Sequence, residues 1–189
     1  MKQLDRLSLF KETIRNTPIY RRFLADQKIN PARIKNLSDW LHIPVSTKEN
    51  YFQHYPREEF FGQQRPVMFY ASSGSSGRPT FWYRGDEQEI LGADIHENIF
   101  KNIFGIKKQE TTLVIICFSM GVGVAGNYTL SSCRHLARRG YNLSVISPGV
   151  EKEDIYSAWR ELGSHYENIV LAGYPPFILD IVREVKKRK

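Results

Sequence analysis

The chain has 189 residues, enough to bury a hydrophobic core as one large domain or as one domain with a small appendage. A hydrophobic content of 41% with 13% aromatic residues excludes an intrinsically disordered chain, and two cysteines exclude a disulfide-rich secreted scaffold. The formal net charge of +7 favours anionic ligands, without choosing between a nucleotide, a nucleic acid and a membrane surface.

The N-terminal segment is predicted to be helical. Apolar residues recur at helical spacing over residues 3–26, and Pro18 interrupts them, which predicts two short helices. A third short helix is expected after Asn30-Pro31, because proline suits a first turn. Further helix starts are expected at Ser38 and at residues 46–49. The first predicted domain is a helical segment over residues 1–61.

The pattern changes to strands after this segment. Residues 67–71 and 80–84 are rich in β-branched and aromatic side chains, which predicts two strands joined by a Ser/Gly-rich loop. Asp86 is expected to cap a helix that runs to about Phe104 and ends at Gly105.

From residue 111 onward, predicted strands and helices alternate. The expected strands are 111–118, 143–147 and 168–172, and the expected helices are 128–139, 151–162 and 175–185. Strands that alternate with helices of this length imply crossover connections and a parallel sheet. The predicted fold class is therefore α/β, with the α/β domain over residues 62–189.

The loop between the first two strands reads Ser72-Ser73-Gly74-Ser75-Ser76-Gly77-Arg78-Pro79-Thr80. Glycines allow tight turns and bring backbone N–H groups close to a ligand, and serine hydroxyls add donors. Such a loop can wrap phosphate oxygens. It is not a Walker A loop, because no Gly-Lys-Ser/Thr ends it. Composition alone is equally consistent with a flexible surface hairpin.

A second glycine-rich segment, Gly121-Val-Gly123-Val-Ala-Gly126, follows a predicted strand and precedes a predicted helix. This is the context of a dinucleotide-binding fingerprint, which would make the chain a Rossmann-type fragment. However, Ser119 and Met120 separate the glycines from the strand, and no acidic residue directly follows the second strand. The pattern therefore favours a glycine turn that lets the helix pack closely on the sheet.

Other chemistry-bearing patterns are weak. Cys133 and His135 resemble a ligand pair, but residues two apart on a helix point to different faces, so we expect no metal site. No nucleophile motif is present. The basic residues 186–189 complement a helix dipole, and no known module or basic–aromatic surface pattern indicates a nucleic-acid partner.

The sequence also predicts a cytoplasmic location. The N-terminus lacks the apolar stretch of a signal peptide, and the longest apolar run, 113–126, is shorter than the about 20 residues that span a bilayer. We therefore expect no membrane partner, and we expect Cys117 and Cys133 to act as small apolar residues in a reducing compartment.

Five stretches, in order, carry a resemblance to a known family. They are 17–21, 41–49 with 55–56, 72–80, 120–149 and 172–175. Together they resemble the N-terminal part of the phenylacetate–CoA ligase-like group of the adenylate-forming (AMP-binding) enzymes. The most specific stretch is 72–80, which resembles the phosphate-binding motif S-S-G-T-T-G-K-P-T. Ser75 and Ser76 replace its threonines and keep the hydroxyls, and Arg78 replaces its lysine and keeps the charge.

The resemblance implies a fold and an activity. The fold is part of the large N-terminal domain of such a ligase: a helical segment, a β-hairpin with the phosphate loop, and a βαβαβα parallel-sheet unit. The activity is ATP-dependent activation of a small-molecule carboxylic acid, for which a phenylacetate-like aryl acid is one candidate. An acyl-adenylate forms first and then a thioester, with coenzyme A as the expected thiol and Mg²⁺ as the expected metal.

The resemblance also assigns site residues. Those expected to hold the β- and γ-phosphates of ATP are Ser72, Ser73, Gly74, Ser75, Ser76, Gly77, Arg78 and Thr80. Those expected to line the acid pocket are Met120, Gly121, Gly123, Gly126, Gly173 and Tyr174. In this interpretation the glycine-rich segment 121–126 does not bind a dinucleotide.

The family's later motifs cannot be placed in this chain. They supply the catalytic residues, the adenine contacts and the acidic magnesium ligand, so no metal ligand is expected here. We therefore expect a fragment, a truncated gene product, or one half of a split enzyme whose other half is a separate chain, and poor activity from this chain alone. A homodimer is also allowed. The alternative is a catalytically inactive nucleotide-binding remnant or partner module.

Overall fold

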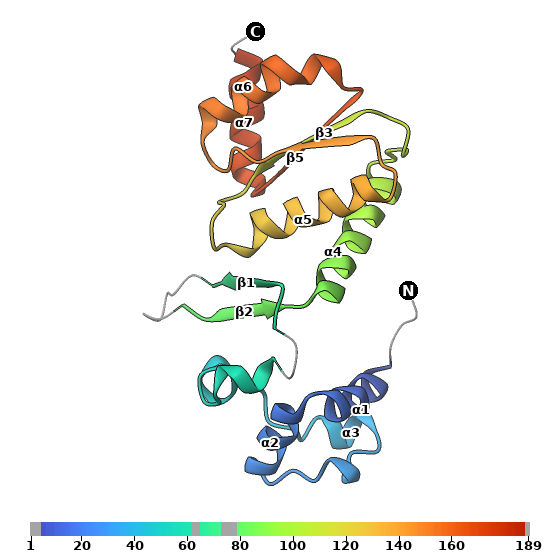
Figure 1. Ribbon diagram of the computed structural model, residues 1–189, viewed down its shortest axis with the longest axis vertical. Helices are drawn as coiled ribbons and strands as arrows, with labels where there is room; N and C mark the ends of the chain where they lie inside the picture. The colour runs from blue at the N-terminus through green and yellow to red at the C-terminus, as the bar shows by residue number, and fades with distance from the viewer. Residues whose placement is uncertain (1–4, 62–64, 73–78, 188–189) are drawn as a thin grey trace. The chain divides into compact units, whose positions relative to one another are not determined.

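The computed structural model describes residues 5–61, 65–72 and 79–187. The chain divides into two compact units, Met1–Arg65 and Pro66–Lys189 (Figure 1).

The first unit consists of short helices. They are α1 (Arg6–Asn16), α2 (Pro18–Asp26) and α3 (Leu37–Trp40), with the single turns η1 (Pro31–Arg33), η2 (Lys48–Phe52) and η3 (Arg57–Phe60). Pro18 is the first residue of α2, where its missing N–H costs no helical hydrogen bond, so the two predicted helices are confirmed. Thr47 caps η2 by accepting a hydrogen bond from the Asn50 N–H at 3.1 Å, which confirms a helix start within 46–49.

Two predicted features of this unit differ in the structure. Asn36, rather than Ser38, caps α3, because its side chain accepts from the Asp39 N–H at 2.9 Å and the Asp39 carboxylate accepts from the Asn36 N–H at 3.2 Å. The helix expected after Asn30 is a single 3₁₀ turn, since the backbone becomes extended again at Ile34.

The core of the first unit is largely aromatic. Its buried residues are Phe10, Ile19, Phe23, Leu24, Tyr51 and Tyr55. The Tyr51 ring packs edge-on against the rings of Phe23 and Phe60 at centroid distances of 5.3 and 5.1 Å. Such aromatic pairs add about 0.5–1.5 kcal/mol each beyond the area they bury. The hydroxyl of Tyr55 donates to Asp26 Oδ2 at 2.7 Å, so the polar end of this buried side chain is satisfied.

The second unit contains a three-stranded parallel sheet. Its strands are β3 (Thr112–Cys117), β4 (Leu143–Ile146) and β5 (Asn168–Gly173), in the order β4-β3-β5. Val114 of β3 lies opposite Val145 on one side and Val170 on the other. All six residues of β3 are buried, as expected for the central strand of a parallel sheet covered on both faces. The predicted parallel sheet is confirmed.

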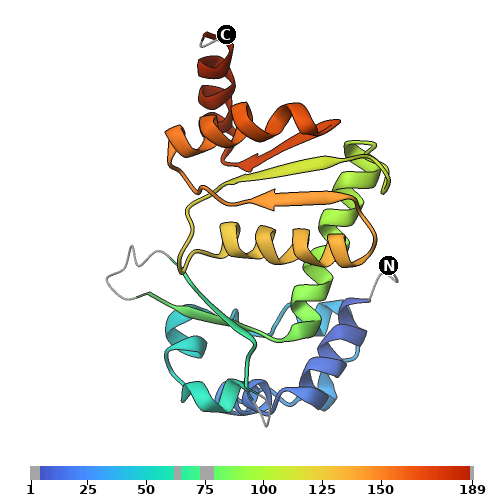
Figure 2. The same ribbon diagram turned by 45° about the horizontal axis from the view of Figure 1, so that its top comes forward.

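Helices cover the two faces of this sheet (Figures 1 and 2). On one face lie α4 (Asp86–Asn98) and α5 (Val124–Arg138); on the other lie α6 (Lys152–Leu162), followed by η5 (Gly163–His165), and α7 (Pro175–Lys187). Successive side chains of β3 point to opposite faces of the sheet, as they do along any strand. Val114 and Ile116 pack with the cluster beneath α5, and Leu113 and Ile115 pack with the cluster beneath α6 and α7.

A two-stranded antiparallel hairpin precedes α4. It is formed by β1 (Met68–Ala71) and β2 (Phe81–Arg84), which confirms the two strands predicted on either side of the Ser/Gly loop. Helix α4 continues as η4 (Ile99–Ile103) and ends at Gly105, whose φ of +69° suits glycine, so the predicted stop is confirmed. The predicted cap is wrong: Gly85 occupies the N-cap position, and its N–H donates to Gln88 Oε1 at 3.0 Å.

Helix α5 begins at Val124, four residues before the predicted start at Tyr128. Gly123, with extended backbone, is its N-cap, so the end of the glycine-rich segment forms the first helical turn. Tertiary packing overrides the low helix propensity of Gly126 here, because this turn lies against the loop that follows β3. Among the described residues, no helix has both the length and the apolar composition that crossing a membrane requires.

Candidate functional site

The two described ends of the Ser/Gly-rich loop lie against each other. The Ser72 N–H donates to the Thr80 carbonyl oxygen at 3.0 Å, and the Thr80 N–H donates to Ser72 Oγ at 3.3 Å. The loop is therefore closed at its base, directly beyond the hairpin. The phosphate contacts expected of Ser73, Gly74, Ser75, Ser76, Gly77 and Arg78 fall in 73–78, outside the described residues, and stay predictions.

Thr80 carries a buried hydroxyl that has no hydrogen-bond partner among the described residues. The residue is only 6% exposed, and its Oγ1 has no partner within the described part of the chain. Leaving a buried hydroxyl unsatisfied costs about 1–3 kcal/mol. Such a group at the end of a hydroxyl-rich loop is suited to receive a ligand atom or an ordered water.

The base of this loop also touches the second glycine-rich segment. The Ala71 N–H donates to the Val122 carbonyl oxygen at 2.8 Å, and Ala71 forms a parallel bridge with Gly123. Two segments that the sequence placed far apart, the predicted phosphate loop and part of the predicted acid pocket, are thus joined by backbone contacts. The sequence predicts each segment but carries no signal for this contact.

The second glycine-rich segment lies at the carboxyl edge of the parallel sheet. Strands β3, β4 and β5 all end there, at Cys117, Ile146 and Gly173. The Gly149 N–H donates to the Ile116 carbonyl oxygen at 3.2 Å, which holds the turn after β4 beside the end of β3. Open α/β sheets bind their ligands outside this edge, so the location suits a binding site.

The six residues expected to line an acid pocket fall into two groups at this edge. One group follows β3 and extends into the first turn of α5: Met120, Gly121, Gly123 and Gly126. The other group is Gly173, the last residue of β5, and Tyr174, which comes directly after it. Their role as a pocket stays a prediction.

Two of these glycines are needed for close packing. A Cβ on Gly126 would lie 2.5 Å from Met120 Sδ, and one on Gly173 would lie 3.0 Å from Cys117 Cβ. Side chains there would push the helix and the strand away from their neighbours. The packing interpretation of the glycine turn is therefore supported at Gly126.

A buried polar pair anchors the hairpin to α4. Tyr70 of β1 and Glu89 of α4 are 1% and 4% exposed, and the Tyr70 hydroxyl donates to Glu89 Oε1 at 3.1 Å. Burial, with the negative charge of Glu89 beside the hydroxyl, raises the pKa of Tyr70 to about 12. The sequence analysis missed this pair. Its only signal was an acidic residue directly before the apolar pair Ile90-Leu91.

The described residues suggest no thiol or metal chemistry. Burial raises the pKa of Cys117 to about 11 and that of Cys133 to about 12, so both thiols are protonated at neutral pH and behave as small apolar side chains. Within residues 5–61, 65–72 and 79–187, no group of three or more His, Cys, Asp or Glu side chains could hold a metal ion.

A curated relative and a solved structure agree with this architecture. No family model matches the chain. Over 71 residues the chain is 34% identical to phenylacetate-coenzyme A ligase of Escherichia coli strain K12. This alignment covers 37% of this chain and 16% of that enzyme. The crystal structure of 2-hydroxyisobutyryl-CoA ligase, in complex with 2-HIB-AMP and CoA in the thioesterification state, superposes with a TM-score of 0.67. That superposition covers 95% of this chain and 38% of the ligase, with 18% sequence identity.

Part of this chain resembles an acid–CoA ligase in sequence, and most of it resembles one in fold. The partial sequence match carries the resemblance to acid–CoA ligases, and the structural match, at 18% identity, shows a shared fold. The predicted resemblance and the α/β fold with a small parallel sheet are confirmed. The chain spans less than two fifths of the length of either protein.

Proposed function

We propose that this chain supplies the phosphate-binding loop and part of the acid pocket of an ATP-dependent acid–CoA ligase. In the proposed reaction a carboxylate oxygen of the acid attacks the α-phosphorus of ATP. The bond to the β-phosphate breaks, and pyrophosphate leaves with its electron pair. The thiol of coenzyme A then attacks the acyl carbon of the adenylate, and AMP leaves.

One observation carries the proposal. The motif at 72–80 lies between two antiparallel strands, its base is closed by Ser72 and Thr80, and the Thr80 hydroxyl is buried without a partner among the described residues. A polyphosphate offers many acceptor oxygens, and Thr80 would donate to one of them. The sequence similarity to phenylacetate-coenzyme A ligase supports the reaction class.

The proposed roles follow from the chemistry of the side chains. The serine hydroxyls and the backbone N–H groups of the loop would hold the β- and γ-phosphates, and the Arg78 guanidinium would offset the charge that develops on the leaving pyrophosphate. The carboxyl edge of the sheet, with Met120 and Gly121, would contact the acid. Because the described residues offer no carboxylate cluster for Mg²⁺, no step is assigned to a metal here.

The test is ATP–pyrophosphate exchange by the complete product of the gene, over a panel of aryl and alkyl acids. We expect acid-dependent exchange in the wild type and a loss of about 100-fold or more in an Arg78→Ala variant. Arg134→Ala, an exposed arginine on α5, is the matched control and should keep full exchange.

Two outcomes would count against this proposal. Folded wild-type protein that gives no exchange with any acid, while still binding ATP, would favour the nucleotide-binding remnant. Equal exchange in the Arg78 and Arg134 variants would remove Arg78 from the site.

A further inference from the structure

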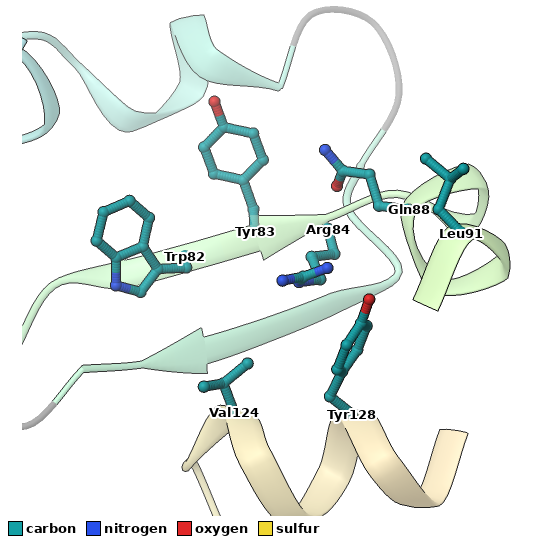
Figure 3. A pocket seen from close by; sticks show the side chains of 7 residues that line it. All are labelled: Trp82, Tyr83, Arg84, Gln88, Leu91, Val124 and Tyr128. Atoms are coloured by element: carbon teal, nitrogen blue, oxygen red, sulfur yellow. The ribbon is translucent and has the colours of Figure 1, made fainter. Parts of the chain in front are cut away.

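The β1–β2 hairpin contacts the beginning of α5, or the residues directly before it, at both of its ends. At the end that carries the loop, the Ala71 N–H donates to the Val122 carbonyl oxygen at 2.8 Å, and Ala71 forms a bridge with Gly123. At the far end, Arg84 of β2 stacks on Tyr128 of α5. Figure 3 shows Arg84 beside the ring of Tyr128, which extends from α5 toward the hairpin. The hairpin is therefore fixed to the start of one helix at two places.

The far contact is a cation–π stack. The guanidinium carbon of Arg84 lies 4.4 Å from the centre of the Tyr128 ring and 5.8 Å from the centre of the Tyr70 ring. Both distances are within the about 6 Å over which a guanidinium is attracted to the face of an aromatic ring. Arg84 is half-buried, and partial removal from water strengthens this attraction. Because Tyr70 belongs to β1 and Tyr128 to α5, the Arg84 side chain links both strands of the hairpin to the helix.

The ring of Tyr128 is itself held in place by α4. A Cβ on Gly92 would overlap the ring and the hydroxyl of Tyr128, so glycine is the residue that leaves room for the ring there. Gly92 lies in the middle of α4, where glycine lowers helix stability relative to alanine. The ring of His96, one turn further along α4, packs edge-on against Tyr128 at a centroid distance of 5.8 Å. Arg84 therefore stacks on a ring whose position is already set.

Together the two contacts determine where the base of the loop lies. Arg84 pairs with Met68, at the opposite end of β1 from Ala71, so about 10 Å of strand separate the two contacts. A hairpin attached at Ala71 alone could pivot about that point, whereas a second attachment at this distance fixes its direction. Ser72 and Thr80, which close the loop, continue directly from the two strands that are fixed in this way.

We propose that Arg84 and Tyr128 are positioning residues. Their stack holds the base of the loop, and with it the Thr80 hydroxyl, at a fixed place beside the glycine-rich segment 121–126. This inference rests on the proposed function, in which the loop binds the polyphosphate and the glycine-rich segment contacts the acid. Neither Arg84 nor Tyr128 touches a substrate in this role. Misplacing one reacting group relative to the other lowers the rate of reaction, even where each substrate still binds.

Hydrogen exchange of the full chain, followed by ¹H–¹⁵N NMR without any ligand, tests the attachment of the hairpin. The Ala71 amide is the reporter, because its hydrogen bond to Val122 breaks whenever the hairpin leaves α5. The Ile115 amide, in the central strand β3, reports the stability of the sheet. We expect Arg84→Met and Tyr128→Leu each to speed hydrogen exchange at Ala71 about tenfold and to leave that at Ile115 unchanged.

Matched variants separate the stack from other contacts. Tyr128→Phe keeps the ring and should behave as the wild type does, and Arg84→Lys keeps the charge and should be intermediate. A double variant, Arg84→Met with Tyr128→Leu, should exchange no faster at Ala71 than either single variant, because the two residues form one contact. Gly92→Ala displaces the ring and should also speed this exchange. Arg134→Met changes an exposed arginine of α5 and should match the wild type.

The kinetics of ATP–pyrophosphate exchange distinguish positioning from general stabilisation. In the complete product of the gene, Arg84→Met should lower kcat about tenfold or more, while the KM values for ATP and for the acid change less than about threefold. Tyr128→Phe should keep the wild-type kcat, and so should Arg134→Met. A variant that lost activity by unfolding would also show faster hydrogen exchange at Ile115, so the two causes are separable.

Several results would overturn the proposal. They are unchanged hydrogen exchange at Ala71 in Arg84→Met, a double variant whose effect is the product of the two single effects, or faster hydrogen exchange at Ala71 with an unchanged kcat. A wild type without pyrophosphate exchange would contradict the proposed reaction instead. The Ala71 amide would then still decide whether the stack of Arg84 on Tyr128 holds the base of the loop.

Discussion

The central sheet and the β1–β2 hairpin of the second unit are stabilised in different ways. Every residue of β3 is buried, and its neighbours are aliphatic side chains from both helical layers. The hairpin leaves Met68 and Phe69 partly exposed and is held by the Tyr70–Glu89 hydrogen bond and by the stacking of Arg84 on Tyr128. The sheet thus provides a rigid scaffold. The hairpin carries buried polar groups, and Thr80, directly before β2, has a hydroxyl without a hydrogen-bond partner among the described residues.

The largest effect is expected from truncating the sheet core. Ile115→Ala removes a fully buried side chain between β3 and the α6–α7 layer, and should lower the free energy of unfolding by about 2–5 kcal/mol. Chemical denaturation measures this. Ile103→Ala, at a position that is 69% exposed, is the matched control and should change stability by less than about 0.5 kcal/mol. An equal loss of unfolding free energy in the Ile115 and Ile103 variants would contradict the role of the sheet as the scaffold.

A smaller loss is expected from breaking the polar anchor of the hairpin. Tyr70→Phe removes the hydroxyl that donates a hydrogen bond to Glu89, so the buried carboxylate loses this partner. The free energy of unfolding should fall by about 1–3 kcal/mol. Adding Glu89→Met removes the stranded charge and should recover most of that loss. A double variant less stable than Tyr70→Phe would show that the pair does not act as a unit.

The last prediction separates the two regions by pH. Folding raises the pKa of Cys117 and Cys133 from 9.0 to about 11 and about 12, and that of Tyr70 from 10.0 to about 12. The folded state therefore keeps protons that the unfolded state releases, so this contribution is complete below pH 9 and is lost as the pH rises toward 12.

In a variant with both thiols replaced by alanine, the decline should begin near pH 10 rather than pH 9, because the groups whose pKa folding raises to about 12 are then the tyrosines Tyr55, Tyr70 and Tyr83. Denaturation curves collected between about pH 8 and about pH 11 measure this. An unchanged onset in the variant would contradict the assignment of the first phase to Cys117 of β3 and Cys133 of α5.

Local patterns were enough to predict much of this fold. The break at Pro18, the stop at Gly105 and the alternation of strands and helices after residue 111 depend on chemistry within a few residues, and all three are confirmed. The start of α5 was predicted too late because packing against the loop after β3 extends the helix through Gly126, and that contact is not encoded locally.

The candidate site was less predictable. The residues of the 72–80 motif were visible in the sequence, but the contact of Ala71 with Val122 and the burial of Thr80 arise from tertiary structure. The stacking of Arg84 on Tyr128 was missed for the same reason. Arg84 and Tyr128 are 44 positions apart, and nothing in either local pattern indicates that they meet.

The central claim is that the loop at 72–80 binds the polyphosphate of a nucleotide, and calorimetric titration of the chain with ATP tests it most directly. We predict saturable binding that inorganic pyrophosphate competes for and AMP does not. Thr80→Val should weaken ATP binding by about tenfold while leaving the fold as stable as, or more stable than, the wild type, because the buried hydroxyl it removes has no partner within residues 5–61, 65–72 and 79–187. Ser132→Ala removes a second buried hydroxyl that lacks a partner in the described part of the chain, on α5, and should leave ATP binding unchanged. ATP binding that is absent, insensitive to pyrophosphate, or identical in the Thr80 and Ser132 variants would contradict the account.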